Sequence, residues 1–557
     1  MIKYPVITAA ALIHRIITAY ADRHIFTASP ADNPGDYCIC SILALAGTWF
    51  LYLMLWQLFI DRFGLFAPAG SKDTKTNTVT RVFRAALPYL IIMIPVCFIK
   101  LRSGYLSNDE TLIYENAVSL THYTWFYYIT TYYYIISLMI IPHMYAPIFI
   151  KLLIEYLVIG YTVMRASDYF DIRSSQPFIS RPVRIGYGSL TMLLFILYPV
   201  IAYTTSAHRL PIYFLLYLFM TVMLLFDRLE QAALTPARLA TLMILGAVLT
   251  QWRTEGIYLV VLIPILIYIS YSELTLLVPH LTGDREERKR KRLPMFYTER
   301  KIIRIKNKKS FGIFLVVWLV VQYLVSIPQN GLIAREMGAA ADDRMKPFYA
   351  YTITNMYRNG LDMDKNAADL AIVDRYISLE SLDKISDYYG DINYEDVLIL
   401  YQPGFVGVRE DAGITEYFEF TAALKRIFKN NPKTFLRTRI GAFVYAALPF
   451  HITFSGTGIR ELVSFMVSIV KTVSYNLFIP LAILLFICLY SLTRSRWFTF
   501  FLSGGLLAHW FIVFILAPAS YFKYYFPVYI TAYLYLLLII IAGLHNKKHA
   551  TKIKILQ

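Results

Sequence analysis

The chain has 557 residues, of which 57% are hydrophobic and only 16% are charged, and its mean hydropathy is +0.50. Soluble domains of this composition would leave apolar surface in water, so the sequence predicts an integral membrane protein. The net charge is +17, and the excess basic residues are expected to gather on one side of the membrane. This explanation is preferred to nucleic-acid binding.

The predicted fold is an α-helical polytopic membrane protein with about 11–12 transmembrane helices, because a span needs about 20 mostly apolar residues. The opening run Val6–Ala21 contains His14 and Arg15, whose charge near a helix centre would cost about 2.5–3.5 kcal/mol. An interfacial helix and a twelfth span therefore both remain open there. Roughly eleven further runs qualify: 41–60, 85–99, 145–164, 186–204, 211–226, 238–251, 257–273, 311–327, 470–491, 497–516 and 526–543.

Basic residues gather in alternate connections, which the positive-inside rule assigns to the cytoplasm. The largest group lies in the connection 274–310, where Asp284–Lys309 holds twelve Lys/Arg against four acids. Its block Arg288–Arg292 is explained by orientation, with anionic lipid or a partner as the alternative. The other basic residues on this side are Arg62, Lys72, Lys75, Arg81, Arg84, Arg165, Arg173, Arg181, Arg184, Lys547, Lys548, Lys552 and Lys554.

The opposite side receives a first exterior loop, 101–144, and a small exterior domain, 328–435, predicted to be α/β or mostly α. Within 361–420 there are fourteen Asp/Glu and four Lys/Arg, an abrupt reversal of the global charge. The apolar spacing predicts helices at Asn366–Tyr376 and Ile414–Phe428.

A strand is predicted at Asp396–Tyr401, followed by a turn at Pro403–Gly404. The exterior domain separates an N-terminal transmembrane region, 1–327, from a C-terminal one, 436–557. The latter opens with an interfacial or re-entrant helix at 436–455, which keeps the alternation of sides intact.

Asp109 and Glu110 are the most informative polar residues, because they stand just outside the second strong span. A carboxylate there can take a proton from an acceptor hydroxyl or help to hold a metal, and general base catalysis typically contributes about 10²- to 10⁴-fold. The alternative is a solvated helix N-terminus, in which Asn108 or Asp109 caps free backbone N–H groups.

Two further polar positions lie on the same exterior side. Arg253 and Glu255 stand in a turn between two short apolar runs, where Arg253 suits an anionic headgroup or simply pairs with Glu255. Lys523, beside Tyr524, is the only charge in the aromatic loop 517–527 and opposes the sidedness bias, so it suits a phosphate.

The remaining exterior candidates are weaker. Arg437 and Arg439 precede an apolar run, where their side chains would grip lipid phosphate or merely lie on it. His122 and His143 have no ligand spacing between them, so a metal site built by the protein has little support. The four cysteines contain no C-x-x-C pair, and the chain has no Walker, G-x-G-x-x-G or G-x-S-x-G motif.

These residues, in this order and on this side, resemble the GT-C superfamily of membrane glycosyltransferases, which use polyprenyl-phosphate sugars in bacterial envelopes. The matching features are the first-loop pair Asp109–Glu110, followed by Tyr114 and Ala117, and the membrane-embedded Arg-x-Glu at position 253. A late exterior domain and the terminal motif Phe522–Pro527 complete the resemblance, which covers most of the chain loosely.

The resemblance implies sugar transfer from a polyprenyl-phosphate donor to a glycan or lipid-linked acceptor, at the outer side of the cytoplasmic membrane. Asp109 would act as the base, with Glu110 as its alternate or as a partner that orients acceptor or metal. A supporting role in the site would fall to Glu255, His122 and Tyr114. The phosphate of the donor would be bound by Arg253, Lys523, Tyr524, Arg437 and Arg439. The need for Mg²⁺ or Mn²⁺ stays open, and membrane lipids but no nucleic acid are expected as partners.

Three alternatives remain. A polysaccharide polymerase or ligase acting on a lipid-diphosphate glycan would use an arginine pair such as Arg437 and Arg439. A transporter or lipid flippase would be expected to show internal repeats, and no convincing repeat is found. A non-catalytic scaffold would leave Asp109 dispensable.

Overall fold

The computed structural model describes residues 3–60, 77–102, 108–122, 126–174, 177–179, 185–206, 208–281, 296–336, 345–382, 409, 413–452, 458–517, 519–549, 553 and 555. The structure is 79% helical, so the chain is an α-helical polytopic membrane protein, as its composition predicts. Within the described residues nine helices are long and apolar enough to cross a membrane: Lys3–Ile25, Pro34–Phe59, Thr78–Cys97, Ala146–Phe170, Leu210–Glu230, Lys308–Gly331, Ile459–Thr493, Trp497–Leu516 and Phe522–Lys548. Two shorter apolar helices, Tyr128–Ile140 and Thr254–Ser270, accompany them, and the total of 11–12 spans stays a prediction.

A hairpin near the N-terminus is formed by α1 (Lys3–Ile25) and α2 (Pro34–Leu55), which continues into the π-helix η1 (Trp56–Ile60). It packs on two helices of the first loop, α5 (Asn108–Val118) and α6 (Tyr128–Ile140). Arg15 does not interrupt α1, because its guanidinium bonds Asp22 at 2.7 Å and Ser41 at 3.0 Å. Pairing of this kind removes most of the penalty of a charge within an apolar helix.

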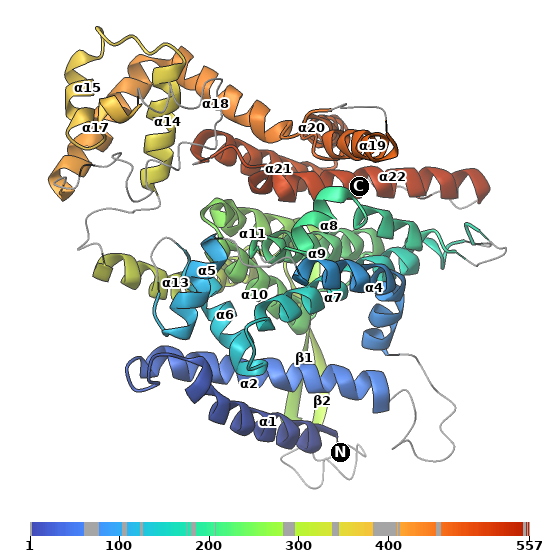
Figure 1. Ribbon diagram of the computed structural model, residues 1–557. Helices are drawn as coiled ribbons and strands as arrows, with labels where there is room; N and C mark the ends of the chain where they lie inside the picture. Colours follow the sequence, from blue (N-terminus) through green and yellow to red (C-terminus); the bar gives the residue numbers. More distant parts are fainter. Residues whose placement is uncertain are drawn as a thin grey trace.

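The central bundle lies between the N-terminal hairpin and the C-terminal helices Trp497–Leu516 and Phe526–Lys548 (Figure 1), and it shares the main hydrophobic core with these C-terminal helices. It contains α4 (Thr78–Arg102), α7 (Ala146–Phe170), η2 (Gly188–Leu194), α8 (Tyr198–Thr204), α9 (Leu210–Glu230), α10 (Pro236–Trp252), η3 (Thr254–Tyr258), α11 (Leu259–Ser270) and α13 (Lys308–Glu336). Helices α4 and α7 touch at Gly160, where a Cβ atom would lie 2.2 Å from the Val82 carbonyl oxygen. Helix α9 ends at Gln231 in the left-handed conformation, and Thr235 caps α10 by accepting from Arg238 N at 3.3 Å.

The span predicted at 186–204 is wrong as a single α-helix. The chain instead forms the 3₁₀ helix η2 and the short helix α8. At Gly188 a Cβ atom would lie 2.1 Å from Ser167 N, so this close approach of two backbones excludes any larger residue there. The segment nevertheless runs along α22, since the Tyr187 ring lies 5.3 Å from His545 and the Tyr203 ring 5.4 Å from Phe526.

The basic connection 274–310 contains an unpredicted antiparallel hairpin, β1 (Glu273–Leu281) paired with β2 (Phe296–Arg304). The block Arg288–Arg292 lies outside the described residues, as do the predicted strand Asp396–Tyr401 and its turn Pro403–Gly404. The predicted exterior helices are present as α15 (Ala367–Asp374) and α17 (Ile414–Asn430).

A separate hydrophobic cluster joins α15 and α17 to α14 (Lys346–Arg358) and to Ala442 of α18 (Pro432–Ala447). Figure 1 shows α14, α15 and α17 grouped away from the hairpin of α1 and α2. The region boundaries at 327 and 435 and the interfacial or re-entrant placement of 436–455 stay predictions. The chain ends with α19 (Ile459–Ser474), α20 (Phe478–Thr493), α21 (Trp497–Leu516), η6 (Phe522–Tyr525) and α22 (Phe526–Lys548).

Charged residues mark the two ends of the central bundle. Arg209 directly precedes α9 and lies beside Glu110, and Asp227 lies near the end of the same helix. The 18 positions between Arg209 and Asp227 correspond to about 27 Å of helix, close to the roughly 30 Å thickness of a bilayer's hydrocarbon core. The Glu110 end and the Asp227 end are therefore spaced as the two surfaces of a membrane would be.

Candidate functional site

The predicted acidic pair lies in the first turn of α5, where the positive end of the helix dipole favours carboxylates. The two side chains differ in environment, because 45% of the Asp109 side chain is exposed and only 1% of Glu110. Asp109 is thus open to a ligand from outside, whereas Glu110 is held within the protein.

The turn that precedes α9 supplies an imidazole and an arginine to this pair. His208 Nδ1 lies 3.3 Å from Glu110 Oε2, and the Arg209 backbone N–H donates to Glu110 Oε1 at 3.3 Å. Arg209 Nη1 lies 3.7 Å from both Asp109 Oδ2 and Glu110 Oε1, within ion-pair range but too far for a hydrogen bond. The guanidinium therefore faces both acids without being saturated by either.

A buried lysine holds this turn in place. Lys151 of α7, which is only 2% exposed, donates a hydrogen bond to the carbonyl oxygen of Ser206. Lys151 also interacts electrostatically with Glu110 and with Glu155 one helical turn further along α7. Its ammonium group thus stabilises both the backbone of the turn and the buried carboxylate that the turn contacts.

The turn between α10 and η3 brings Arg253 and Glu255 to the same region. Arg253 Nε donates to Glu255 Oε2 at 3.0 Å and Nη2 donates to the second oxygen, a bidentate pair. The ion pair that the sequence left as an alternative is therefore present. The Arg253 guanidinium also lies 5.0 Å from the centre of the Tyr524 ring, which connects this turn to η6.

Lys523 in η6 is the cation with the fewest polar contacts in the region. Its Nζ has no hydrogen bond or ion pair with any residue that the structure describes, and it rests over the Tyr521 ring at 4.5 Å and the Tyr524 ring at 5.9 Å. It is close enough for electrostatic interaction with Asp109, Glu110 and Arg253. An ammonium group stacked on rings but lacking a counter-ion is suited to an anionic ligand.

These contacts define one site, which we call the Glu110 site. Its members come from four separate segments of the chain and are Asp109, Glu110, His208, Arg209, Arg253, Glu255, Lys523 and Tyr524. Three carboxylates face two arginines and a lysine, and Lys523 and the exposed Asp109 have the fewest polar partners among the described residues.

The two arginines of α18 are not brought into this site. Arg437 is exposed on the helix surface. Arg439 is 1% exposed and donates to the carbonyl oxygens of Phe514 at 2.7 Å and Ala517 at 3.0 Å, at the end of α21. The Arg439 guanidinium thus satisfies carbonyl groups at the end of a helix, as a structural cap does, and phosphate binding by either arginine stays a prediction.

His122 and Tyr114 also lie outside the Glu110 site. His122 Nε2 lies 3.1 Å from Asp36 Oδ2, and the other oxygen of Asp36 accepts from the hydroxyl of Tyr132. His122 therefore helps to join α2 to α6. Tyr114 packs on the hydrophobic cluster of α2, α5 and α6, and burial raises the pKa of its hydroxyl.

Within the described ranges, no three His, Cys, Asp or Glu side chains are grouped so that they could hold a metal ion. The acids of the Glu110 site are instead arranged around Arg209 and His208. The residues present thus give no support to a protein-built Mg²⁺ or Mn²⁺ site, which prefers several oxygen ligands.

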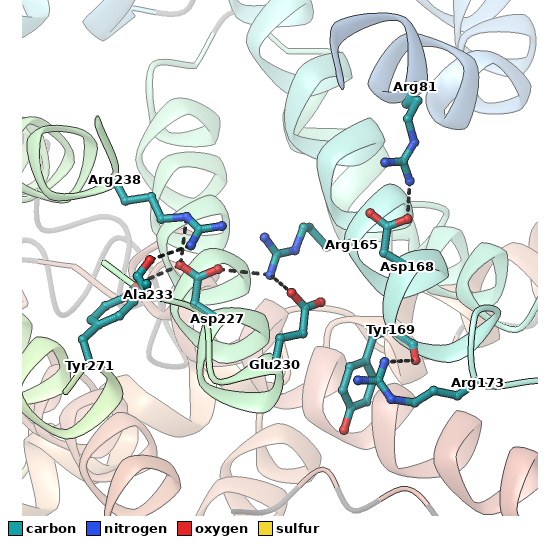
Figure 2. Close-up of polar contacts among 10 residues, drawn as sticks. All are labelled: Arg81, Arg165, Asp168, Tyr169, Arg173, Asp227, Glu230, Ala233, Arg238 and Tyr271. Atoms are coloured by element: carbon teal, nitrogen blue, oxygen red, sulfur yellow. Dashed lines mark hydrogen bonds and ion pairs between the residues drawn. The ribbon is translucent and has the colours of Figure 1, made fainter. Parts of the chain in front are cut away.

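The opposite end of the same helices carries a second polar cluster, shown in Figure 2. Asp227 is 0% exposed and receives Arg165 at 3.1 Å, Arg238 at 3.5 Å and the Tyr271 hydroxyl at 2.6 Å. Arg165 also bonds Glu230 at 3.0 Å. We call these five residues the Asp227 hub; Arg165, predicted to lie in a basic connection, is instead an integral part of α7.

The chain matches no protein-family model, and no curated protein or solved structure is significantly similar to it. The functional argument therefore depends on the chemistry of the Glu110 site itself. His208, Arg209 and Lys151 were not singled out from the sequence. An arginine in an exterior turn opposes the sidedness bias as Lys523 does, and the same reasoning would have identified Arg209.

Proposed function

We propose that this chain is a membrane glycosyltransferase that moves a sugar from a polyprenyl-phosphate donor to an envelope glycan or lipid-linked acceptor. The observation that carries the proposal is that an exposed carboxylate, Asp109, interacts electrostatically with Lys523, whose ammonium group forms no hydrogen bond or close ion pair within the described part of the chain. Glycosyl transfer requires both a base and a separate positive group.

The chemistry follows from this division. Asp109 accepts the proton of the acceptor hydroxyl as its oxygen forms a bond to the anomeric carbon of the sugar. The bond from that carbon to the phosphate oxygen breaks, and the electron pair leaves with the lipid phosphate. Lys523 and Arg209 stabilise the charge that develops there, because preorganised cations in a partly dehydrated site act strongly on such charge.

Glu110 has a different role from Asp109. Its carboxylate is buried and is already contacted by His208 and by the Arg209 backbone, so it orients the cationic turn. Asp109, with nearly half of its side chain exposed, is free to meet the acceptor. This contrast favours Asp109 as the base.

The proposed site of action is the outer surface of the cytoplasmic membrane. The positive-inside rule assigns the basic connections to the cytoplasm. In the predicted topology the Glu110 site lies on the opposite side of the membrane. The polymerase or ligase alternative depended on a free arginine pair, and the engagement of Arg439 with two carbonyl groups weakens that argument.

The decisive experiment measures sugar transfer and release of lipid phosphate by the purified protein in nanodiscs, with a labelled polyprenyl-phosphate sugar. Asp109→Asn is expected to lower turnover by about 10²- to 10⁴-fold, because it removes the base. Glu115→Gln is the matched control, since Glu115 is an exposed acid on the same helix, and it should react as the wild type does.

Normal turnover of Asp109→Asn would end the proposed mechanism. Movement of intact donor lipid across the bilayer, without cleavage of its sugar–phosphate bond, would instead establish the transporter alternative.

A further inference from the structure

A polar cluster surrounds the Arg253–Glu255 pair. Tyr213 of α9 and His509 of α21 are each 1% exposed and interact electrostatically with both Arg253 and Glu255. Tyr524 of η6 contributes its backbone carbonyl to His509. Four segments of the chain therefore converge on one buried ion pair; we call this group the His509 cluster.

The contact to Tyr524 determines which nitrogen of His509 can accept a hydrogen bond. His509 Nε2 lies 3.1 Å from the Tyr524 carbonyl oxygen, and a carbonyl only accepts, so the proton of the neutral ring is on Nε2. Nδ1 then presents a lone pair. This atom is buried and has no hydrogen-bond partner among the residues that the structure describes.

The hydroxyl of Tyr213 is in the same situation, because it too is buried without a hydrogen-bond partner in the described part of the chain. A buried polar atom left unpaired costs about 1–3 kcal/mol, so buried polar groups normally have a partner. Two such atoms around a single ion pair indicate a polar group that the protein alone does not provide.

The chemistry of the cluster selects that group. His509 Nδ1 and the Glu255 oxygens accept hydrogen bonds, and the Tyr213 hydroxyl can donate or accept. A phosphate offers mainly acceptors and would be repelled by Glu255, whereas a sugar ring offers several hydroxyl donors. The Tyr258 ring, 5.6 Å from His509, adds an aromatic surface to the cluster.

We infer that the His509 cluster binds the hydroxyl groups of the donor's sugar, while Lys523 and Arg209 hold its phosphate. The inference rests on the proposed function and assigns the two parts of the donor to two neighbouring sets of residues. Arg253 joins them, since it pairs with Glu255 on one side and stacks on the Tyr524 ring on the other.

The test measures the dissociation constants of two probes in nanodiscs, a polyprenyl phosphate that carries a hexose and the same polyprenyl phosphate without it. The wild type should bind the sugar-bearing probe more tightly. Tyr213→Phe and His509→Gln, which keeps the donor to Tyr524, should each reduce that preference by about three- to tenfold and leave binding of the bare probe unchanged.

Thermal unfolding separates this role from a structural one. Tyr213→Phe removes a hydroxyl without a partner, so its melting temperature should equal or exceed that of the wild type. Tyr271→Phe is the matched control in the Asp227 hub: it removes a hydroxyl bonded to Asp227 and should lower the melting temperature while the sugar preference stays intact.

Three results would overturn the inference. A Tyr213→Phe variant that melts as early as Tyr271→Phe and keeps its sugar preference would show a structural hydroxyl. Equal binding of the two probes by the wild type would remove the sugar site while leaving the phosphate site. Binding of neither probe would remove the proposed function as well.

Discussion

Helices α7 and α9 run between two clusters, each of which combines carboxylates with basic side chains, and the clusters differ in how closely those charges are paired. In the Asp227 hub, the central carboxylate is 0% exposed and has three partners within 3.5 Å. In the Glu110 site, Nη1 of the Arg209 guanidinium lies 3.7 Å from the nearest carboxylate oxygen of each acid, and the Asp109 side chain is 45% exposed.

The difference distinguishes a structural cluster from a site that can accept a ligand. A buried ion pair is tolerated in a fold when its charged groups have close partners, as the Asp227 carboxylate has. A carboxylate and an ammonium group that stay close without forming a bond retain the capacity to act on something else. Four predictions test this contrast, and they are ordered by expected effect.

The largest effect is a difference in stability, and it should appear when one carboxylate in each of the two clusters is replaced by alanine. Asp227→Ala removes the buried carboxylate that pairs with Arg165 and Arg238 and leaves Arg165 with Glu230 alone, so it should lower the free energy of unfolding by about 3–5 kcal/mol. Asp109→Ala removes a half-exposed acid and should lower it by less than about 1 kcal/mol. Thermal melting in detergent measures both variants, and equal losses would abolish the distinction between the two clusters.

Next comes a comparison of two lysines that rest on aromatic rings. Lys523→Met should weaken binding of a polyprenyl phosphate by about 10- to 100-fold, as expected for a hydrogen bond to a charged group. Lys471→Met is the control, because Lys471 lies over Tyr198 at 5.7 Å and Phe450 at 5.5 Å but belongs to α19. If both variants lose the same affinity, the location of Lys523 beside the acids has no significance.

A smaller effect should follow from loosening the turn that carries Arg209. The double variant Lys151→Met with Glu155→Gln leaves no buried charge unpaired and removes the hydrogen bond to Ser206. Binding of the lipid phosphate should weaken by about three- to tenfold, and adding Arg209→Ala should contribute less than it does alone, since coupled residues are not additive. Fully additive losses would argue against positioning by Lys151.

The smallest effect is a difference in salt dependence. Raising the ionic strength from about 0.05 to 0.5 M should weaken lipid-phosphate binding at the Glu110 site a few-fold, because partly exposed charges are screened. The melting temperature, which depends on the closed Asp227 hub, should change little. A strong salt dependence of melting with none in binding would reverse the comparison.

The sequence was sufficient to predict the members of the Glu110 site that stand out from an apolar or oppositely charged background. Asp109, Glu110, Arg253 and Lys523 all lie together in the structure. Arg209 could not be paired with the acids beforehand, since 99 positions separate its backbone amide from its partner Glu110. Only the fold brings such distant segments together.

Other errors have equally specific causes. Hydropathy does not distinguish α from 3₁₀ turns. The 3₁₀ helix that begins at Gly188 could therefore not be predicted within 186–204, because it accompanies a close contact of Gly188 with Ser167 that only the structure shows. The direction of a side chain on a short helix is also hidden: Arg437 and Arg439 are two positions apart, yet one is exposed and the other is buried against the end of α21.

The engagement of Arg439 has a mechanical consequence. Its guanidinium bonds the carbonyls of Phe514 and Ala517 and lies 5.8 Å from the ring of Tyr351, whose hydroxyl bonds Ser520. Helix α14 is thereby connected to the loop that leads into Lys523. A displacement of α14 relative to this loop would break the hydrogen bond between Tyr351 and Ser520 or shift the loop, so the position of Lys523 is coupled to that of α14.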